Sequence, residues 1–295
     1  MGKHITQQYA DFISLVEIEI RPENKKFVNH FIYTVRAIKI LIISWVVIIG
    51  TLEIVNIWGM TNWINALSVD VYYILLILPP LCLFLLLYVY RYNKTIKIIN
   101  ILTQDCDVVK FLELYSYLMS GAKPWNNYWG VFYYNLGRGL FAAGRMEDAE
   151  KVHSLIAKYC TDTWGQFYYE MIAIDLAGYK KNYEEMEAHC QKASYVQNGL
   201  QLKTSLRSRY MEIMQYPHFV QLSNRGEYQE LYNLLSQYEA KAQSMAAKVS
   251  KNFYLYKIAL LLGNGEKAKE HKAFVIQNGG SLWYRSAVMT ESPEA

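Results

Sequence analysis

The cysteines and histidines are the side chains of this 295-residue chain that are best suited to metal binding or nucleophilic chemistry. Cys82, Cys106, Cys160 and Cys190 lack the Cys-x-x-Cys spacing that is typical of metal and redox sites. His189 is adjacent to Cys190, but neighbouring side chains on a helix diverge by about 100° and share one metal poorly. We therefore expect free, buried thiols, no metal site and no cofactor.

Enzyme signatures are absent from the sequence, which contains no phosphate-binding loop, no nucleophile elbow and no His-Glu-x-x-His motif. Residues 101–295 carry 21 basic and 20 acidic residues without a basic stripe, so nucleic acid is not an expected partner. A hydrophobic content of 53% excludes a disordered chain. The sequence predicts a folded protein that is not an enzyme.

Two apolar runs, residues 40–58 and 71–90, predict membrane-spanning helices. Each is about 20 residues long, the length with which a helix crosses ~30 Å of hydrocarbon. The first run begins too far from the N-terminus for a secretory signal peptide. Two buried core helices are the alternative, but a transmembrane hairpin accounts better for the short connection between the runs.

Flanking charge predicts the orientation of this hairpin. The loop at residues 60–70 contains no Lys or Arg, and nine basic residues flank the two runs: Lys3, Arg21, Lys25, Lys26, Arg36, Lys39, Arg91, Lys94 and Lys97. The positive-inside rule then places both termini in the cytoplasm of a multi-pass plasma-membrane protein, and the pattern suits a bacterial membrane. Interfacial aromatic residues are expected at the outer surface (Trp58, Trp63, Tyr72, Tyr73) and at the inner surface (Tyr88, Tyr90).

Three features of the N-terminal third leave alternatives open. Glu53 is either part of an ion path or an interfacial carboxylate, and we favour the interface. Pro79-Pro80 should kink the second span, either for packing, which we favour, or as a gate. Residues 1–30 read as an amphipathic helix with a strand-like end, and Pro22 should stop either element.

The rest of the chain has helical periodicity, and residues 134–149, YNLGRGLFAAGRMEDA, resemble the tetratricopeptide repeat (TPR). This repeat is a pair of antiparallel helices. Small Gly137 and Ala149 would let the two helices approach closely, and Leu136 and Leu140 would fill the space between them. Gly144 would supply the left-handed residue that ends the first helix.

Weaker copies place Met186, Leu231 and Ala268 at the position of Ala149, with spacings of 37, 45 and 37 residues against an ideal of 34. An earlier repeat unit places Val109 at the position of Ala149. The first helix of this earlier unit, residues 91–102, should continue the second membrane span. The resemblance implies an all-α fold in which the hairpin is followed by a TPR-like α-solenoid of about four to five helix pairs, with an ordinary helical bundle as the alternative.

The expected organisation has four parts: a cytoplasmic segment (1–39), the transmembrane hairpin (40–90), the repeat domain (91–285) and a disordered tail (286–295). The resemblance further implies a concave groove that binds a protein or peptide. Its expected lining is Tyr134, Asn135, Arg138, Phe141, Met171, Asp175, Tyr179, Phe253 and Lys257. An Arg138–Asp175 contact between neighbouring units is the alternative role of those two residues.

These expectations converge on a membrane-anchored cytoplasmic scaffold or adaptor whose groove binds a protein or peptide partner. The alternative is an accessory or sensor subunit of a membrane complex, in which the hairpin itself contacts a membrane-protein partner. The lipid bilayer is a partner in both cases. Nothing in the sequence indicates which protein is bound.

Overall fold

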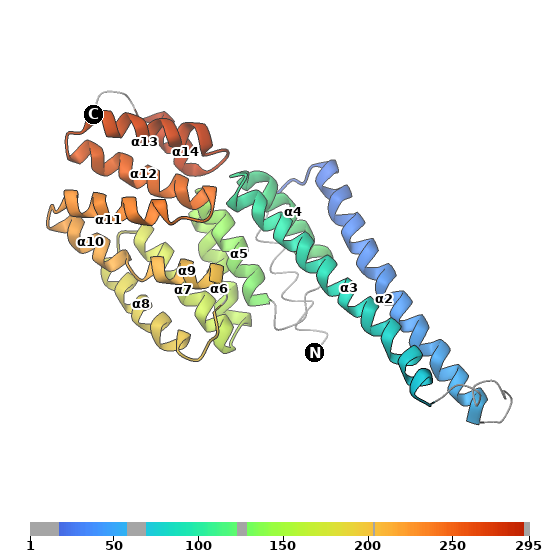
Figure 1. Ribbon diagram of the computed structural model, residues 1–295. Helices are drawn as coiled ribbons and strands as arrows, with labels where there is room; N and C mark the ends of the chain where they lie inside the picture. Colours follow the sequence, from blue (N-terminus) through green and yellow to red (C-terminus); the bar gives the residue numbers. More distant parts are fainter. Residues whose placement is uncertain (1–17, 58–68, 123–128, 203, 292–295) are drawn as a thin grey trace. The chain divides into compact units, whose positions relative to one another are not determined.

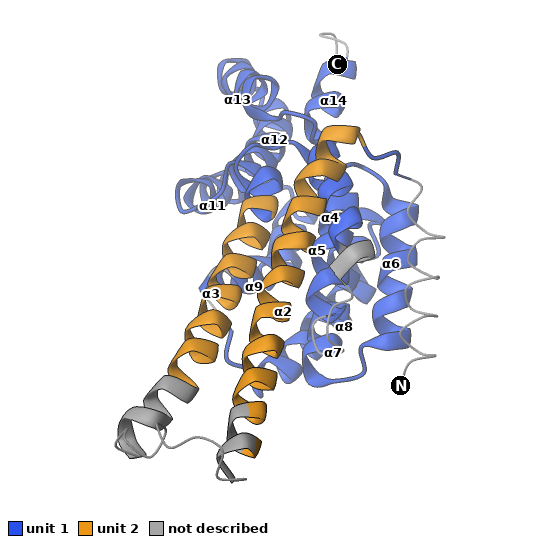
Figure 2. Ribbon diagram, turned by 90° about the vertical axis from the view of Figure 1, so that its right-hand side faces the viewer, with its two compact units in different colours: residues 1–20, 99–295 blue, residues 21–98 orange. Residues whose placement is uncertain are grey.

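The computed structural model describes residues 18–57, 69–122, 129–202 and 204–291 (Figure 1). Its secondary structure is helical, with no strand in those ranges, so the predicted all-α fold is confirmed there. The chain forms two compact units, which are described separately (Figure 2). Unit 1 comprises residues 1–20 and 99–295, and unit 2 comprises residues 21–98.

Unit 2 contains α2 (Pro22–Ile57) and most of α3 (Val69–Thr103). Pro22 begins α2 instead of stopping an element, because the missing amide proton of proline has no partner at the first helical position anyway. α2 is 36 residues long, about 54 Å at 1.5 Å per residue, and therefore exceeds the ~30 Å of a hydrocarbon core. The predicted first span is the second half of this longer helix.

α3 confirms that residues 91–102 continue the second apolar run as one helix, which keeps Pro79 and Pro80 in its interior. Several expectations lie outside the described part of the chain. These are the fold of residues 1–17, the loop aromatics Trp58 and Trp63, and the side chains of Glu53, Tyr72 and Tyr73.

Two ring contacts set the register between α2 and α3. The rings of Phe31 and Tyr90 stack with centroids 5.7 Å apart. One turn further toward the start of α2, the Lys94 Nζ lies 5.2 Å from the centroid of the Phe27 ring. Four residues forward on α2 therefore correspond to four residues back on α3, so the two helices are antiparallel.

Val28 and Phe31 of α2 are buried, but many apolar side chains in its second half are exposed. Ile40 is 61% exposed, Ile43 62% and Val47 61%. Among the described residues, one helical segment, Pro22–Thr51, is long and apolar enough to cross a membrane, and 6% of its most apolar stretch is buried. A second segment of this kind is not found among those residues, so the multi-pass topology gains no support from length and composition.

Unit 1 is built from helices joined by short turns. They are α4 (Val108–Ala122), α5 (Trp129–Ala142), α6 (Met146–Tyr159), α7 (Thr163–Tyr179), α8 (Tyr183–Gln197), α9 (Thr204–Ile213), α10 (Tyr216–Asn224), α11 (Tyr228–Ala240), α12 (Met245–Leu261), α13 (Gly265–Asn278) and α14 (Trp283–Thr290). Side chains cap several of the N-termini, as Asn182 does for α8 and Asn264 for α13.

Successive helices pack in pairs, most extensively α5 with α6, α7 with α8, and α12 with α13. Of the five aligned positions, Ala149, Met186, Leu231 and Ala268 are at most 5% exposed, so these four are equivalent in burial. Val109 is 52% exposed, so its alignment with Ala149 is wrong. Gly144 follows α5 with a φ of 76°, as its predicted role requires. The predicted helix end at Gly144 is confirmed, since α5 ends at Ala142.

The third copy departs from the expected pattern because its first helix is divided. α9 ends at Ile213 and α10 begins at Tyr216, with Pro217 in its first turn. Proline is favoured at that position and ends a preceding helix, so the break is locally encoded. The two residues between α9 and α10 and the longer link between α8 and α9 contribute to the 45-residue spacing.

The predicted disordered tail, residues 286–295, is wrong over residues 286–290. These belong to α14, whose Val288 is fully buried. The segment before α14 also contacts the beginning of the unit. The amide of Ser281 donates to the Cys106 carbonyl at 2.9 Å, and the Ser281 Oγ accepts from the Val108 amide at 2.8 Å. The first and last helices of unit 1 are thereby joined.

Candidate functional site

A cluster of charged side chains lies where α7, α9, α10 and α12 meet. The Arg209 Nη2 donates to both carboxylate oxygens of Asp175 at 2.8 and 3.1 Å. Its Nη1 donates to Glu212 at 3.1 Å and to the Tyr216 hydroxyl at 2.9 Å. The Lys251 Nζ donates to Glu212 at 2.6 Å. We call these five residues the charged cluster.

Burial and pairing set the protonation of the charged cluster. Asp175 is 9% exposed and Lys251 is 5% exposed. Burial lowers the pKa of Lys251, although Glu212 acts in the opposite direction. Burial would raise the pKa of Glu212, but Arg209 and Lys251 together bring it below its ordinary value. The cluster is therefore an interior ion network in which each charge depends on its neighbours.

Next to this network lie the predicted groove residues of α5. Tyr134 is 3% exposed and stacks on Tyr168 with centroids 5.0 Å apart. The Arg138 guanidinium carbon lies 5.6 Å from the centroid of the Tyr134 ring. The Asn135 amide donates to the Tyr115 hydroxyl at 3.3 Å and to a carbonyl of its own helix. Arg138 is half-buried and so remains accessible, whereas Asn135 is engaged within the protein.

The alternative role of Arg138, an ion pair with Asp175, is not found, because Asp175 pairs with Arg209. Burial raises the pKa of Asp175 overall, although the charge of Arg138 still acts to lower it. Sequence reasoning missed Arg209. It lies on α9, the helix that the repeat alignment did not separate from α10. The sequence did offer one signal for this residue, an arginine in a helical segment to which no role was assigned. Its pairing with Asp175 could not be predicted, because that pairing depends on how α7 and α9 pack.

Two further groove assignments are wrong because the side chains belong to the core. Met171 is fully buried, and Phe253 is 7% exposed and packs on Trp283 and Tyr284. Tyr179 fits the prediction better, since it is 53% exposed and makes an edge contact with Phe141. Lys257 is partly exposed and pairs with Glu291.

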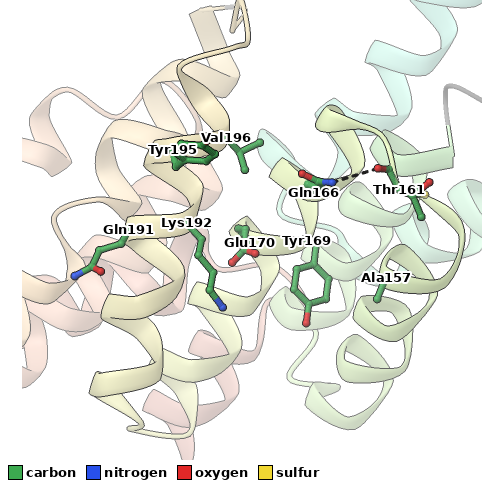
Figure 3. A pocket seen from close by; sticks show the side chains of 10 residues that line it. Ala157, Thr161, Gln166, Tyr169, Glu170, Gln191, Lys192, Tyr195 and Val196 are labelled. Atoms are coloured by element: carbon green, nitrogen blue, oxygen red, sulfur yellow. Dashed lines mark hydrogen bonds between the residues drawn. The ribbon is translucent and has the colours of Figure 1, made fainter.

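A separate cavity of about 610 Å³ lies between α6, α7 and α8 (Figure 3). Its lining includes Tyr169, Glu170, Lys192 and Tyr195. Glu170 is 9% exposed, and one of its carboxylate oxygens lies 2.5 Å from the His189 Nδ1. The cavity therefore combines a held carboxylate, an ammonium group and two phenol rings.

Reactive chemistry in this cavity has no support from its thiol. Cys160 lines the cavity, and burial raises the pKa of this thiol to about 12, which keeps it protonated. The buried thiols of Cys106 and Cys190 behave alike, with a pKa of about 11. Cys82 departs from the expected burial because its side chain is exposed.

Metal-binding groups of three or more His, Cys, Asp or Glu side chains are absent from the described ranges. Comparisons with protein-family models, curated proteins and solved structures give no match to this chain. The fold and the site therefore define a class of architecture: paired helices around an ion network, in a chain with one long, exposed apolar helix.

Proposed function

We propose that the protein is a membrane-anchored scaffold that presents a TPR-like helical array to a protein partner at the cytoplasmic surface. The observation that supports this most strongly is the exposure of α2, with 6% of its most apolar stretch buried. A core helix of a soluble domain would bury this surface, whereas a lipid bilayer covers it without cost.

The proposal includes the second span. From Leu81 to Tyr90, α3 has an apolar sequence whose large side chains are mostly exposed, among them Phe84 at 54% and Leu86 at 61%. Its contacts with α2 are antiparallel, as a hairpin requires. Together with the flanking charges, these features support two spans and cytoplasmic termini.

The repeat character of unit 1 rests on equivalent small or apolar residues at the four aligned positions and on close packing between paired helices. A Cβ on Gly137 would lie 2.7 Å from the Ile172 Cδ1, so α5 and α7 approach closely there. The partner surface that we propose is smaller than the groove predicted from the sequence. It consists of the accessible side chains Arg138, Phe141 and Tyr179.

The alternative function, an accessory subunit that binds its partner through the hairpin, is favoured by the exposed apolar surface that α3 shares with α2. The two proposals differ in which surface holds the partner. In-cell crosslinking of the full-length protein decides between them. The scaffold loses its crosslinks in Arg138→Glu and Tyr179→Ala, whereas the accessory subunit keeps them and loses them in Phe84→Ala with Leu86→Ala.

The membrane anchor has its own test. A cysteine introduced at Asn65 should react with an impermeant maleimide added to intact cells, and one introduced at Ser286 should react only after lysis. Ser286 is exposed on α14, so its protection would report the membrane and not burial. Reaction at Ser286 in intact cells contradicts the orientation, and recovery of the chain in the soluble fraction contradicts the anchor.

A further inference from the structure

Basic and aromatic side chains occupy neighbouring positions along the axis of the α2–α3 pair. Phe31 and Tyr90 stack and serve as a reference level on the two helices. At 1.5 Å per residue, Arg36 lies about 8 Å and Lys39 about 12 Å further along α2, toward the apolar stretch. Arg91 lies about 2 Å from the same reference on α3, in the opposite direction.

The direction of the side chains brings these groups closer together. Every Cα–Cβ bond in a helix tilts toward the N-terminus of that helix. On α2 this tilt carries Arg36 and Lys39 back toward the reference level. Because α3 is antiparallel, the same tilt carries Arg91 and Lys94 toward that level from the other side. The four cations therefore lie within about 18 Å of one another along the axis of the helix pair, with their side chains directed toward the reference level.

The same stretch of the helix pair carries exposed aromatic rings. Tyr33 is 65% exposed, Tyr88 57% and Tyr92 50%, and the last two stack with centroids 6.3 Å apart. Tyrosines with an apolar ring and a polar tip are enriched where a bilayer meets water. We call these three tyrosines, together with Arg36, Lys39, Arg91 and Lys94, the interfacial band.

Within the described residues, no carboxylate pairs with the basic side chains of the interfacial band. Residues 24–52 and 71–104 contain no Asp or Glu. In the described part of the chain, Arg36, Lys39, Arg91 and Lys94 form no ion pair. Lys94 makes cation–π contacts with the rings of Phe27 and Tyr90, at 5.2 and 5.6 Å. Four cations beside an apolar helix pair offer a positively charged surface to an anion at the membrane.

We propose that the interfacial band is a binding site for the headgroups of anionic phospholipids in the cytoplasmic leaflet. The inference rests on the membrane anchor proposed above and specifies the lipid that surrounds it. Each phosphate would receive hydrogen bonds from Arg36 or Arg91, whose planar guanidinium suits two phosphate oxygens, while Lys39 acts as a point charge. The tyrosine rings would lie among the glycerol and upper acyl carbons.

The size of the effect follows from the number of charges. A basic residue close to an anionic membrane surface contributes about fivefold to affinity. Arg36, Lys39 and Arg91, the three residues proposed to contact phosphate, therefore contribute about 100-fold together at low salt. We therefore expect at least a tenfold preference for an anionic over a zwitterionic lipid. The preference should weaken as salt is added.

The test uses the full-length protein in a neutral detergent, incubated with equimolar dioleoyl phosphatidylglycerol and dioleoyl phosphatidylcholine. Native mass spectrometry then counts the lipids that stay bound. The wild type should retain phosphatidylglycerol at least tenfold over phosphatidylcholine. The triple variant Arg36→Gln, Lys39→Gln, Arg91→Gln should retain the two lipids about equally, since glutamine preserves the helix but not the charge.

Two controls separate charge at this site from charge in general. Arg207→Gln, Lys241→Gln and Lys269→Gln remove three exposed cations from unit 1 and should leave the preference unchanged. Arg36→Lys with Arg91→Lys keeps the charges and should keep most of the preference. A free phosphate site is distinguished by adding 10 mM inorganic phosphate, which should not displace phosphatidylglycerol.

Equal retention of both lipids by the wild type overturns the proposal, as does a preference that survives in the triple Gln variant. Displacement by inorganic phosphate also overturns it, because the site would then bind the free ion. These outcomes differ from failure of the anchor itself. A chain that stays in the membrane fraction but shows no lipid preference contradicts only the headgroup site.

Discussion

Replacing Arg209 by leucine tests the ion network most directly. Arg209→Leu keeps most of the aliphatic volume and removes four hydrogen bonds, two to Asp175 and one each to Glu212 and Tyr216. Asp175, which is 9% exposed, would then be a buried carboxylate without its cation. Removing one partner of a buried ion pair costs about 3–5 kcal/mol, and a lost 1 kcal/mol lowers the Tm of a unit of this size by about 2–4 °C. We expect the Tm of unit 1 to fall by about 6–20 °C.

The assay is thermal unfolding of the full-length protein in detergent, followed by tryptophan fluorescence. Trp129 is 1% exposed and lies in unit 1, so its emission reports unfolding of that unit. Arg207→Leu is the matched control, because Arg207 is exposed on the same helix and should shift the Tm by less than about 2 °C. Adding Asp175→Asn to Arg209→Leu should recover about 2 kcal/mol, since a neutral amide is cheaper to bury than a lone carboxylate.

The reasoning is refuted if Arg209→Leu melts within about 2 °C of the wild type. It is also refuted if the two substitutions are additive, since additivity means that Asp175 and Arg209 do not stabilise each other.

Three other perturbations test the packing and electrostatics of unit 1. Burial, and secondarily the charge of His189, lowers the pKa of His153 to about 4, so the folded state resists protonation of this side chain. The free energy of unfolding should therefore fall by up to about 3 kcal/mol between pH 6.5 and pH 4. His153→Phe keeps the stack on Tyr169 and should flatten a plot of Tm against pH. Ala149→Leu should cost about 1–3 kcal/mol in thermal melts, because Ala149 is fully buried in a position without space for three more carbons; an unchanged Tm would mean that α5 and α6 do not approach closely there. Gly139→Ala places a methyl group 2.5 Å from the buried Phe111 ring and should lower the Tm. Gly178→Ala is the control, because its methyl group meets only the Met186 sulfur at 3.6 Å and should leave the Tm unchanged. An equal Tm for the two variants contradicts the packing of α4 on α5.

The helical pairs could be predicted because their signals are local. Gly144 ends a helix through its own backbone conformation, and small or apolar residues recur at the buried aligned positions. The ends of elements were harder to predict. Pro22 was expected to stop a helix and instead begins one, since proline is tolerated in the first turn and the sequence does not say on which side the helix lies. α14 was missed because a short helix after two glycines has few periodic positions, although Val288 is fully buried.

The candidate site was predicted only in part, because its central contacts join residues that are distant in sequence. Arg138 and Tyr179 could be placed on an accessible face from the repeat pattern alone. The pairing of Asp175 with Arg209 spans 34 residues and depends on the division of α9 from α10. Met171 and Phe253 were assigned to the groove from repeat positions, but apolar side chains gain more by packing into the core.

The contact of Ser281 with Cys106 and Val108 has a consequence for how unit 1 folds and unfolds. It joins residues separated by more than 170 positions, so the loop that it closes includes nearly the whole unit. In an open stack of repeats each helix pair contacts only its neighbours, and the terminal pairs can fray independently. Here the first and last pairs hold each other, which favours a single cooperative unfolding transition and slow folding through a long-range contact. Losing the few residues before α14 would then loosen α4, which lies about 170 residues earlier in the chain.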